Sequence, residues 1–250
     1  MAFSARSSTN HLRLLVLAAV AFGFTYTSAL AGEESIRKAW PARLKDFPKI
    51  DEIRKMPVPG LYEVRAGNAI YYADENGDHL IAGSIFDTKT QANLTEARNR
   101  SLAAADFASI PRADVVTTKR GSGARHVIVF ADPNCGFCKK LEVELAKLND
   151  VTIDTVLYPI LGPDSVTKSR NVFCAKESGV VWTEWMTSGR PIPGRAASCS
   201  AVAIERNIAL GRRLNISGTP AMMFEDGSIL RGAADLPTIE RHLQAGSAKR

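Results

Sequence analysis

Residues 126–149 read HVIVFADPNCGFCKKLEVELAKLN, and they contain the clearest structural signal in the chain. Its first five residues form a short apolar run that is typical of a buried strand. The segment Ala131–Asn134 breaks the strand, and the leucines from Lys139 to Asn149 repeat at the spacing of one helix face. The sequence therefore predicts a strand-to-helix junction, with Cys135 at or just before the first helical turn and Cys138 within it.

A cysteine at the start of a helix is suited to thiolate chemistry. The first N–H groups of a helix have no partner within the helix, and its dipole is positive at this end. A free cysteine has a pKa near ~8.5, and such a setting lowers the pKa by one to several units. Cys138 follows Cys135 closely enough to resolve a mixed disulfide. The pair predicts dithiol–disulfide exchange.

Two other interpretations of a CxxC motif are less consistent with this sequence. Half of a zinc site would need a second pair of cysteines or histidines at a suitable spacing. Cys174 and Cys199 lie far apart, and the four histidines are scattered. We therefore expect no metal. A purely structural disulfide within so short a loop would be strained and easily reduced.

The N-terminal residues are typical of a secretory signal. Arg6 and Arg13 are basic, an apolar core runs from Leu14 to Phe24, and Ala29-Leu30-Ala31 resembles a cleavage site. We expect residues 1–31 to be removed. The apolar core is short for a membrane span, which needs about 20 residues, so an uncleaved anchor is the weaker alternative. Export implies an oxidising compartment in which disulfides persist.

Composition and charge limit the possible chemistry and partners of the chain. The chain has 250 residues, a net charge of +6 and four cysteines, which fit one reactive pair and one structural pair. Basic residues alternate with acidic ones, as in Arg37-Lys38, Asp51-Glu52 and Arg54-Lys55. The sequence has no basic stripe with interleaved aromatic residues, so we expect no nucleic-acid partner.

Residues 32–92 predict a small domain of helical character followed by an antiparallel sheet. Helical spacing extends from residue 32 to about 56 and is limited by two prolines. Its apolar positions are Ile36, Trp40, Leu44 and Phe47, and the prolines are Pro41 and Pro48. Three strands follow at Leu61–Val64, Ala69–Ala73 and His79–Ile85, with turns at Gly67-Asn68 and Asn76-Gly77. So small a sheet needs a covering helix or a second subunit.

The sequence predicts that residues 93–120 form a linker and that residues 121–250 form a second domain. Asn93–Ile110 is expected to be a helix that ends before Pro111, and Lys119–Gly123 a polar joint. The expected elements that follow the CxxC helix are a strand at Val151–Tyr158, a helical region at about 164–186, a helix at about 200–214, a hairpin at Ala221–Arg231 turning at Asp226-Gly227, and a last helix from Pro237. This is a thioredoxin-like α/β order with a helical insertion, within an α+β chain.

Two motifs, FADPNCGFC at 130–138 and SGTPA at 217–221, together resemble the DsbC/DsbG family of periplasmic disulfide isomerases. The resemblance extends through PVPGL at 57–61 and covers essentially the whole chain after the predicted signal. It implies a periplasmic homodimer joined through its N-terminal domains. It also implies a cleft for unfolded or wrongly disulfide-bonded exported proteins, a membrane electron donor of the DsbD type, and no cofactor.

The resemblance also implies roles for single residues. Cys135 resembles the attacking thiol and Cys138 the resolving one. Pro220 resembles the family's cis-proline, and Thr219 precedes it. We expect the Thr219 hydroxyl to donate a hydrogen bond toward the Cys135 sulfur.

Cys174 and Cys199 resemble the family's structural disulfide. Thioredoxin has a buried aspartate six residues before its first active-site cysteine, whereas this chain has Val129, in agreement with the isomerase branch. Phe137 stands where DsbC commonly has tyrosine, so the resemblance does not fix the reduction potential of the CxxC pair.

Further interpretations concern residues around the motif and the class of protein. Asp132 is expected to help cap the helix that follows it. Trp182 and Trp185 are expected to pack in the interior rather than bind peptide. The rival functions are a monomeric DsbA-type oxidant, which would not need residues 32–95, and a chaperone-like holder of unfolded chains, which would not need the cysteines.

Overall fold

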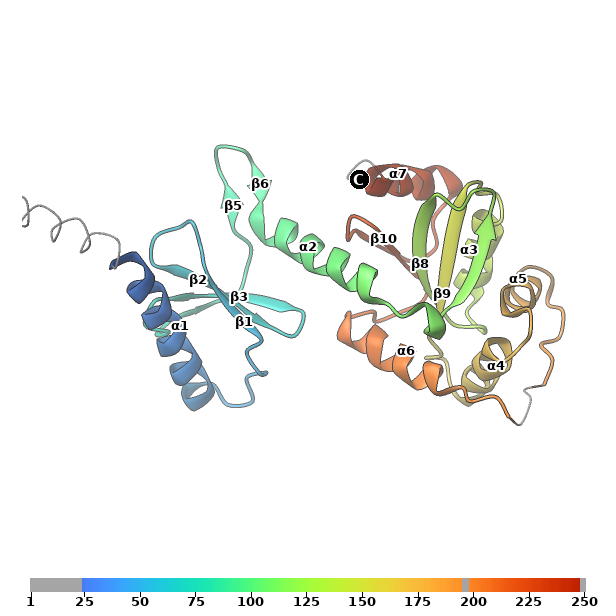
Figure 1. Cartoon of the computed structure of the whole chain (residues 1–250), viewed down its shortest axis with the longest axis horizontal. Helices are drawn as coiled ribbons and strands as arrows, with labels where there is room; N and C mark the ends of the chain where they lie inside the picture. Colours follow the sequence, from blue (N-terminus) through green and yellow to red (C-terminus); the bar gives the residue numbers. More distant parts are fainter. Residues whose placement is uncertain (1–23, 195–197, 248–250) are drawn as a thin grey trace, which may run out of the picture. The chain divides into compact units, whose positions relative to one another are not determined.

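The computed structural model describes residues 24–194 and 198–247, which divide into two units after Gly83 (Figure 1). Most of the predicted signal peptide, with Arg6, Arg13 and all of the apolar core except Phe24, lies outside the described residues. Among the described helices, none is long and apolar enough to cross a membrane.

The described part of the first unit, residues 24–83, contains one helix and a four-stranded antiparallel sheet in the order β1-β2-β3-β4. The elements are α1 (Phe24–Arg43), β1 (Glu52–Lys55), β2 (Leu61–Ala66), β3 (Ala69–Asp74) and β4 (Leu80–Ile81). The prediction of three strands was wrong, because β1 was assigned to the helical segment. Ile53 alone is buried in β1, so this charged strand has too little apolar alternation to be recognised. The last strand is also shorter than predicted.

The helix and the sheet of the first unit share one core. The core residues are Ile36, Trp40, Ile50, Ile53, Tyr62, Val64 and Ala73, with Leu44 and Phe47 packed against them. The indole N–H of Trp40 donates to the carbonyl of Gly77 at 3.2 Å. Gly77 has φ +67°, as the predicted turn at Asn76-Gly77 requires. The helix therefore covers the sheet and holds its last turn.

The second unit is built on a five-stranded sheet in the order β11-β10-β8-β9-β7. The strands are β7 (Val116–Arg120), β8 (Arg125–Ala131), β9 (Val151–Leu157), β10 (Ala221–Phe224) and β11 (Ile229–Arg231). β8 and β9 are parallel, and every other pair in this sheet is antiparallel. Lys119 and Arg120 pair with β9 as part of β7, so the prediction of a polar joint was wrong for these two residues.

The described residues of the second unit also form six α-helices. They are α2 (Leu94–Ser109), α3 (Gly136–Leu145), α4 (Pro163–Phe173), α5 (Ser178–Ser188), α6 (Val202–Arg213) and α7 (Leu236–Ser247); a 3₁₀ turn η1 (Arg112–Asp114) follows α2, and a two-stranded ribbon of β5 (Phe86–Asp87) and β6 (Ala92–Asn93) precedes it. The predicted helical region at 164–186 is thus two helices. α2 begins as predicted, with the Asn93 side chain accepting the N–H of Glu96 at 3.0 Å.

Both faces of the five-stranded sheet are buried. Along β8, Val127 and Val129 join a cluster that includes Leu141 and Leu145 of α3, Trp182 and Met186 of α5, and Ile239 and Leu243 of α7. Ile128 and Phe130 join a second cluster that includes Phe107 of α2 and Leu210 of α6. Successive residues of a strand point to opposite faces, so a strand covered on both sides is apolar throughout. This explains the unbroken apolar run that precedes the CxxC motif.

Candidate active site

The strand register brings three loops to one edge of the sheet. Ala131 of β8 pairs with Leu157 of the parallel strand β9, so the loops after both strands leave at the same edge. Ala221 of β10 lies opposite Phe130 in the antiparallel sense, so the residues before Ala221 arrive at that edge too. The CxxC loop therefore lies beside Thr219-Pro220, whose peptide bond is cis.

Cys135 is the N-cap residue of α3 and a free thiol. Its sulfur accepts a hydrogen bond from the backbone N–H of Cys138 at 3.3 Å. Its thiol lies 3.3 Å from the carbonyl oxygen of Thr219 and donates to it. Only 6% of Cys135 is exposed. The first turn of the helix thus supplies a backbone donor to this sulfur, as the sequence predicted.

Cys138 is also a free thiol, and it lies deeper, with 3% of the residue exposed. Burial raises the pKa of the Cys138 thiol far above its ordinary value, and its interaction with Cys135 raises it further. A hydrogen bond with the backbone of Asp132 and, to a smaller extent, one with the Thr219 side chain lower the pKa of Cys138 and offset part of this rise. The Thr219 hydroxyl, expected at Cys135, therefore acts on Cys138, while the Thr219 carbonyl contacts Cys135.

Asp132 does not cap α3, and that prediction was wrong because Cys135 is the N-cap. The fully buried Asp132 carboxylate instead ties the CxxC loop to the loop between β9 and α4. It accepts hydrogen bonds from the N–H of Asn134 (2.8 Å), the hydroxyl of Ser165 (2.7 Å), and the N–H groups of Ile160 (2.8 Å) and Leu161 (3.0 Å). Three of these contacts join residues 28 to 33 positions apart, so the sequence offered no signal for them.

The two tryptophans of α5 differ. Trp182 is buried in the core, as predicted. Trp185 is half-buried, and its indole N–H donates to the carbonyl of Pro133 at 2.6 Å. The ammonium groups of Lys139 and Lys168 lie 4.7 and 4.6 Å from the centre of its ring. Trp185 therefore packs against the active-site loop itself, a position that sequence reasoning missed.

Glu142 is a second residue that the sequence analysis missed. It is buried on α3, and its carboxylate accepts hydrogen bonds from the Trp182 indole at 3.1 Å and the Thr183 hydroxyl at 3.3 Å. Burial raises the pKa of Glu142, although both hydrogen bonds oppose the rise. A signal was available: Glu142 lies four residues after Cys138 and hence on the same helix face.

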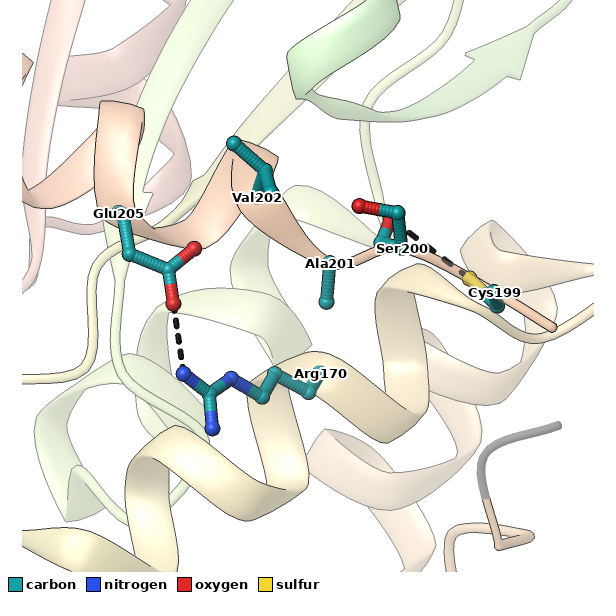
Figure 2. A pocket seen from close by; sticks show the side chains of 6 residues that line it. All are labelled: Arg170, Cys199, Ser200, Ala201, Val202 and Glu205. Atoms are coloured by element: carbon teal, nitrogen blue, oxygen red, sulfur yellow. Dashed lines mark hydrogen bonds and ion pairs between the residues drawn. The ribbon is translucent and has the colours of Figure 1, made fainter. Parts of the chain in front are cut away.

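Cys174 and Cys199 form a disulfide, with their Cα atoms 5.9 Å apart. A pocket of about 190 Å³ lies beside Cys199, where Arg170 of α4 pairs with Glu205 of α6 at 2.6 Å. Figure 2 shows the side chains that line this pocket. The remaining residues that line it are Ser200, Ala201 and Val202. None of them belongs to the CxxC or Thr219 loops, so the pocket is not part of the dithiol site.

A CxxC motif at the first turn of a helix, beside a cis-proline at the edge of such a sheet, defines the thioredoxin-like class of thiol–disulfide proteins. Residues 113–247 match the family described as thioredoxin-like domain. Residues 27–96 match the family described as disulfide bond isomerase protein N-terminal domain. The chain therefore combines both domains.

Similar proteins of described function identify one family within this class. The probable thiol:disulfide interchange protein DsbC of Bordetella avium is 38% identical over 207 residues, or 83% of this chain and 72% of that protein. DsbC of Escherichia coli K12 is 29% identical over 189 residues, or 74% and 77% of the two chains. A solved disulfide interchange protein from Neisseria gonorrhoeae is 31% identical, with a TM-score of 0.52, and covers 55% of this chain and 98% of its own. The chain belongs to the DsbC family and is a thiol–disulfide oxidoreductase of the isomerase type.

Proposed function

We propose that the protein isomerises non-native disulfides in exported proteins through the reduced dithiol of Cys135 and Cys138. The Cys135 thiolate attacks one sulfur of a substrate disulfide, so that a mixed disulfide forms and the other substrate sulfur leaves as a thiolate. That thiolate can attack a second substrate disulfide, which releases another substrate thiolate. The newly released thiolate then attacks the mixed disulfide and displaces Cys135, which leaves as a thiolate. Alternatively, Cys138 attacks the mixed disulfide, the substrate leaves reduced, and CxxC becomes a disulfide.

The asymmetry of the two thiols carries this proposal. The Cys135 sulfur receives the N–H of Cys138 at the start of α3, whereas the Cys138 thiol lies deeper in the core. The raised pKa of Cys138 keeps the second thiol protonated. A protonated resolving thiol attacks slowly, because the thiolate is the nucleophile. The mixed disulfide then persists long enough for the substrate to rearrange, which is what isomerisation needs and simple reduction does not.

We infer that the protein works in the periplasm as a homodimer, with residues 1–31 as signal, 32–92 as dimerisation domain and a linker that starts at residue 93 and ends before β7. The edge strand β4 supports the dimer, because Leu80 and Ile81 are 37% and 50% exposed there. Exposed apolar edge strands are otherwise prone to aggregate. Isomerase activity needs a reduced CxxC, so a membrane thiol reductase of the DsbD type is the proposed electron donor.

Refolding of scrambled ribonuclease tests the proposed function. The double variant Cys135→Ala/Cys138→Ala should lose this activity completely. Retained suppression of aggregation, with no isomerase activity in the parent chain, would instead identify a holder of unfolded chains. Trapping the thiols with acid in the periplasm separates isomerase from oxidant. A mostly reduced CxxC is expected, and a mostly oxidised one would indicate a DsbA-type protein.

Sedimentation of the chain from residue 32 onward tests the dimer. Ile81→Asp should shift the equilibrium toward monomer, because a charge would then interrupt the apolar edge. Val58→Asp is the matched control, since Val58 is exposed to a similar extent but precedes β2. A parent chain that is monomeric at micromolar concentration would contradict the dimer.

A further inference from the structure

Asp132 is a fully buried carboxylate next to the reactive cysteine, and the exchange steps described above do not use it. Each of its four side-chain hydrogen bonds comes from a donor: three backbone N–H groups and the hydroxyl of Ser165. Ser165 directs its proton to Asp132, and its oxygen accepts from the Asn134 amide at 2.9 Å. A carboxyl group surrounded only by donors has the environment of an ionised carboxylate.

The backbone of Asp132 also forms the turn that holds Cys135. Its carbonyl oxygen accepts the N–H of Cys135 at 3.1 Å, while its side chain accepts the N–H of Asn134. The same carboxylate binds Ile160 and Leu161 in the neighbouring loop. The Asp132 side chain thus fixes the loop that contains Cys135 relative to the loop that follows β9.

No lysine, arginine or histidine among the described residues forms an ion pair with Asp132. The ammonium group of Lys168 binds the Asn134 side chain at 2.8 Å and Asp164 at 2.6 Å instead. The negative charge is therefore held by hydrogen bonds and is not neutralised by a cation. A water-excluded region screens charges only weakly, and Asp132 lies three residues before Cys135, so this charge is placed to act on a thiolate at Cys135.

We propose that Asp132 is a positioning residue that fixes the Cys135 loop and makes the CxxC dithiol more reducing through its buried charge. The inference rests on the proposed redox function of the two cysteines. In the relevant exchange, the dithiol and one glutathione disulfide give the CxxC disulfide and two glutathione thiols. The dithiol loses two electrons and the glutathione disulfide gains them. The charge of Asp132 disfavours the thiolate in the reduced form and so favours oxidation of CxxC.

The redox equilibrium of the full chain in glutathione buffers tests the proposal. Asp132→Asn removes the charge and preserves the size of the side chain. It should shift the equilibrium about tenfold toward the dithiol, which corresponds to a reduction potential about 30 mV higher for a two-electron couple. Alkylation of Cys135 by iodoacetamide at neutral pH should become faster, because more of its thiolate is present.

Two control variants separate this effect from a general loss of structure. Asp114→Asn makes the same change at another buried aspartate, which binds Arg206 and does not contact the CxxC loop. Ser165→Ala keeps the Asp132 charge and removes one of its donors. Both should lower the free energy of unfolding and leave the redox equilibrium within about twofold of the parent. An equal shift in Ser165→Ala would assign the effect to loop geometry and overturn the role of the charge.

Three further outcomes separate a failure of the inference about Asp132 from a failure of the proposed function. An Asp132→Asn variant that folds and has the parent's equilibrium overturns the inference. If that variant does not fold, the ¹³C carboxyl resonance of Asp132 in the parent chain should still move between the reduced and oxidised states, because the coupling is reciprocal. An unchanged resonance overturns the inference. A parent chain that does not exchange with glutathione refutes the proposed function itself, which distinguishes the two failures.

Discussion

The two cysteine pairs of the second unit contrast in an unexpected way. Cys135 and Cys138 are buried and free, whereas Cys174 and Cys199 are partly exposed and joined. Cys135 begins helix α3, whose first turn offers an N–H to its sulfur. Cys174 is the C-cap of helix α4, where the negative end of the dipole disfavours a thiolate. The end of the helix at which a cysteine lies, rather than its exposure, therefore distinguishes the cysteine suited to react from the cysteine suited to a permanent bond.

The largest effect should come from removing either thiol of the buried pair. Cys135→Ser should abolish disulfide exchange, since no thiolate remains at the start of α3. Cys138→Ala should instead accumulate mixed disulfides with substrates, because Cys135 can attack but nothing resolves the product. Non-reducing gels after acid trapping would detect these species. If alkylation mapping found Cys138 to be the faster thiol, the roles would have to be exchanged.

Removing the partly exposed pair should affect stability far more than catalysis. The disulfide joins residues separated by 25 positions, and the chain-entropy model gives about 3 kcal/mol for a loop of this length. Cys174→Ala/Cys199→Ala should therefore lower the free energy of unfolding in urea by about this amount and retain dithiol cycling below the transition. Mild reduction of the parent chain should open CxxC first. Loss of all exchange activity in the folded double variant would contradict the contrast between the pairs.

A smaller effect is expected at Thr219. Its side chain lowers the pKa of the buried Cys138 thiol, so Thr219→Val should raise that pKa further. Resolution of mixed disulfides should then slow several-fold at neutral pH, and its pH profile should move to higher pH. Stopped-flow release of a substrate peptide measures this rate. Thr187→Val is a suitable control, because the Thr187 hydroxyl donates to the carbonyl of Thr183 on the exposed side of α5. Equal rates in Thr219→Val and the parent would exclude the hydroxyl's role.

The smallest effect should be a change in the pH dependence of stability caused by Glu142. Burial raises the pKa of Glu142 above its ordinary value of 4.5. The folded chain thus keeps this proton at a pH where the unfolded chain has lost it. The contribution of this proton to the free energy of unfolding is complete below the ordinary pKa of Glu142. It is lost as the pH rises through the pKa of Glu142 in the folded chain. Glu142→Gln cannot lose a proton, so its free energy of unfolding should fall less between about pH 4 and pH 8 in urea titrations. Parallel curves for the two proteins would contradict this.

The accuracy of the sequence predictions varies with the range of the interactions involved. The order of elements around CxxC could be predicted, because Val127 to Phe130 and the leucines of α3 follow local periodicity. The strand β1 was missed, since its charged residues hide the one buried isoleucine. The Asp132 contacts and the place of Trp185 depend on residues brought together by the parallel register of β8 and β9 and by the packing of α5. Local pattern contains no information about such contacts.

The position of Trp185 has an optical consequence. The chain has three tryptophans, of which Trp40 and Trp182 lie in cores. The indole of Trp185 alone among them is bonded to the loop that precedes Cys135, and two ammonium groups lie near its ring. Indole emission depends on nearby charge and hydrogen bonding. Oxidation of CxxC should therefore change the fluorescence of Trp185 more than that of Trp40 or Trp182. The emission of Trp185 would then report the redox state of the protein.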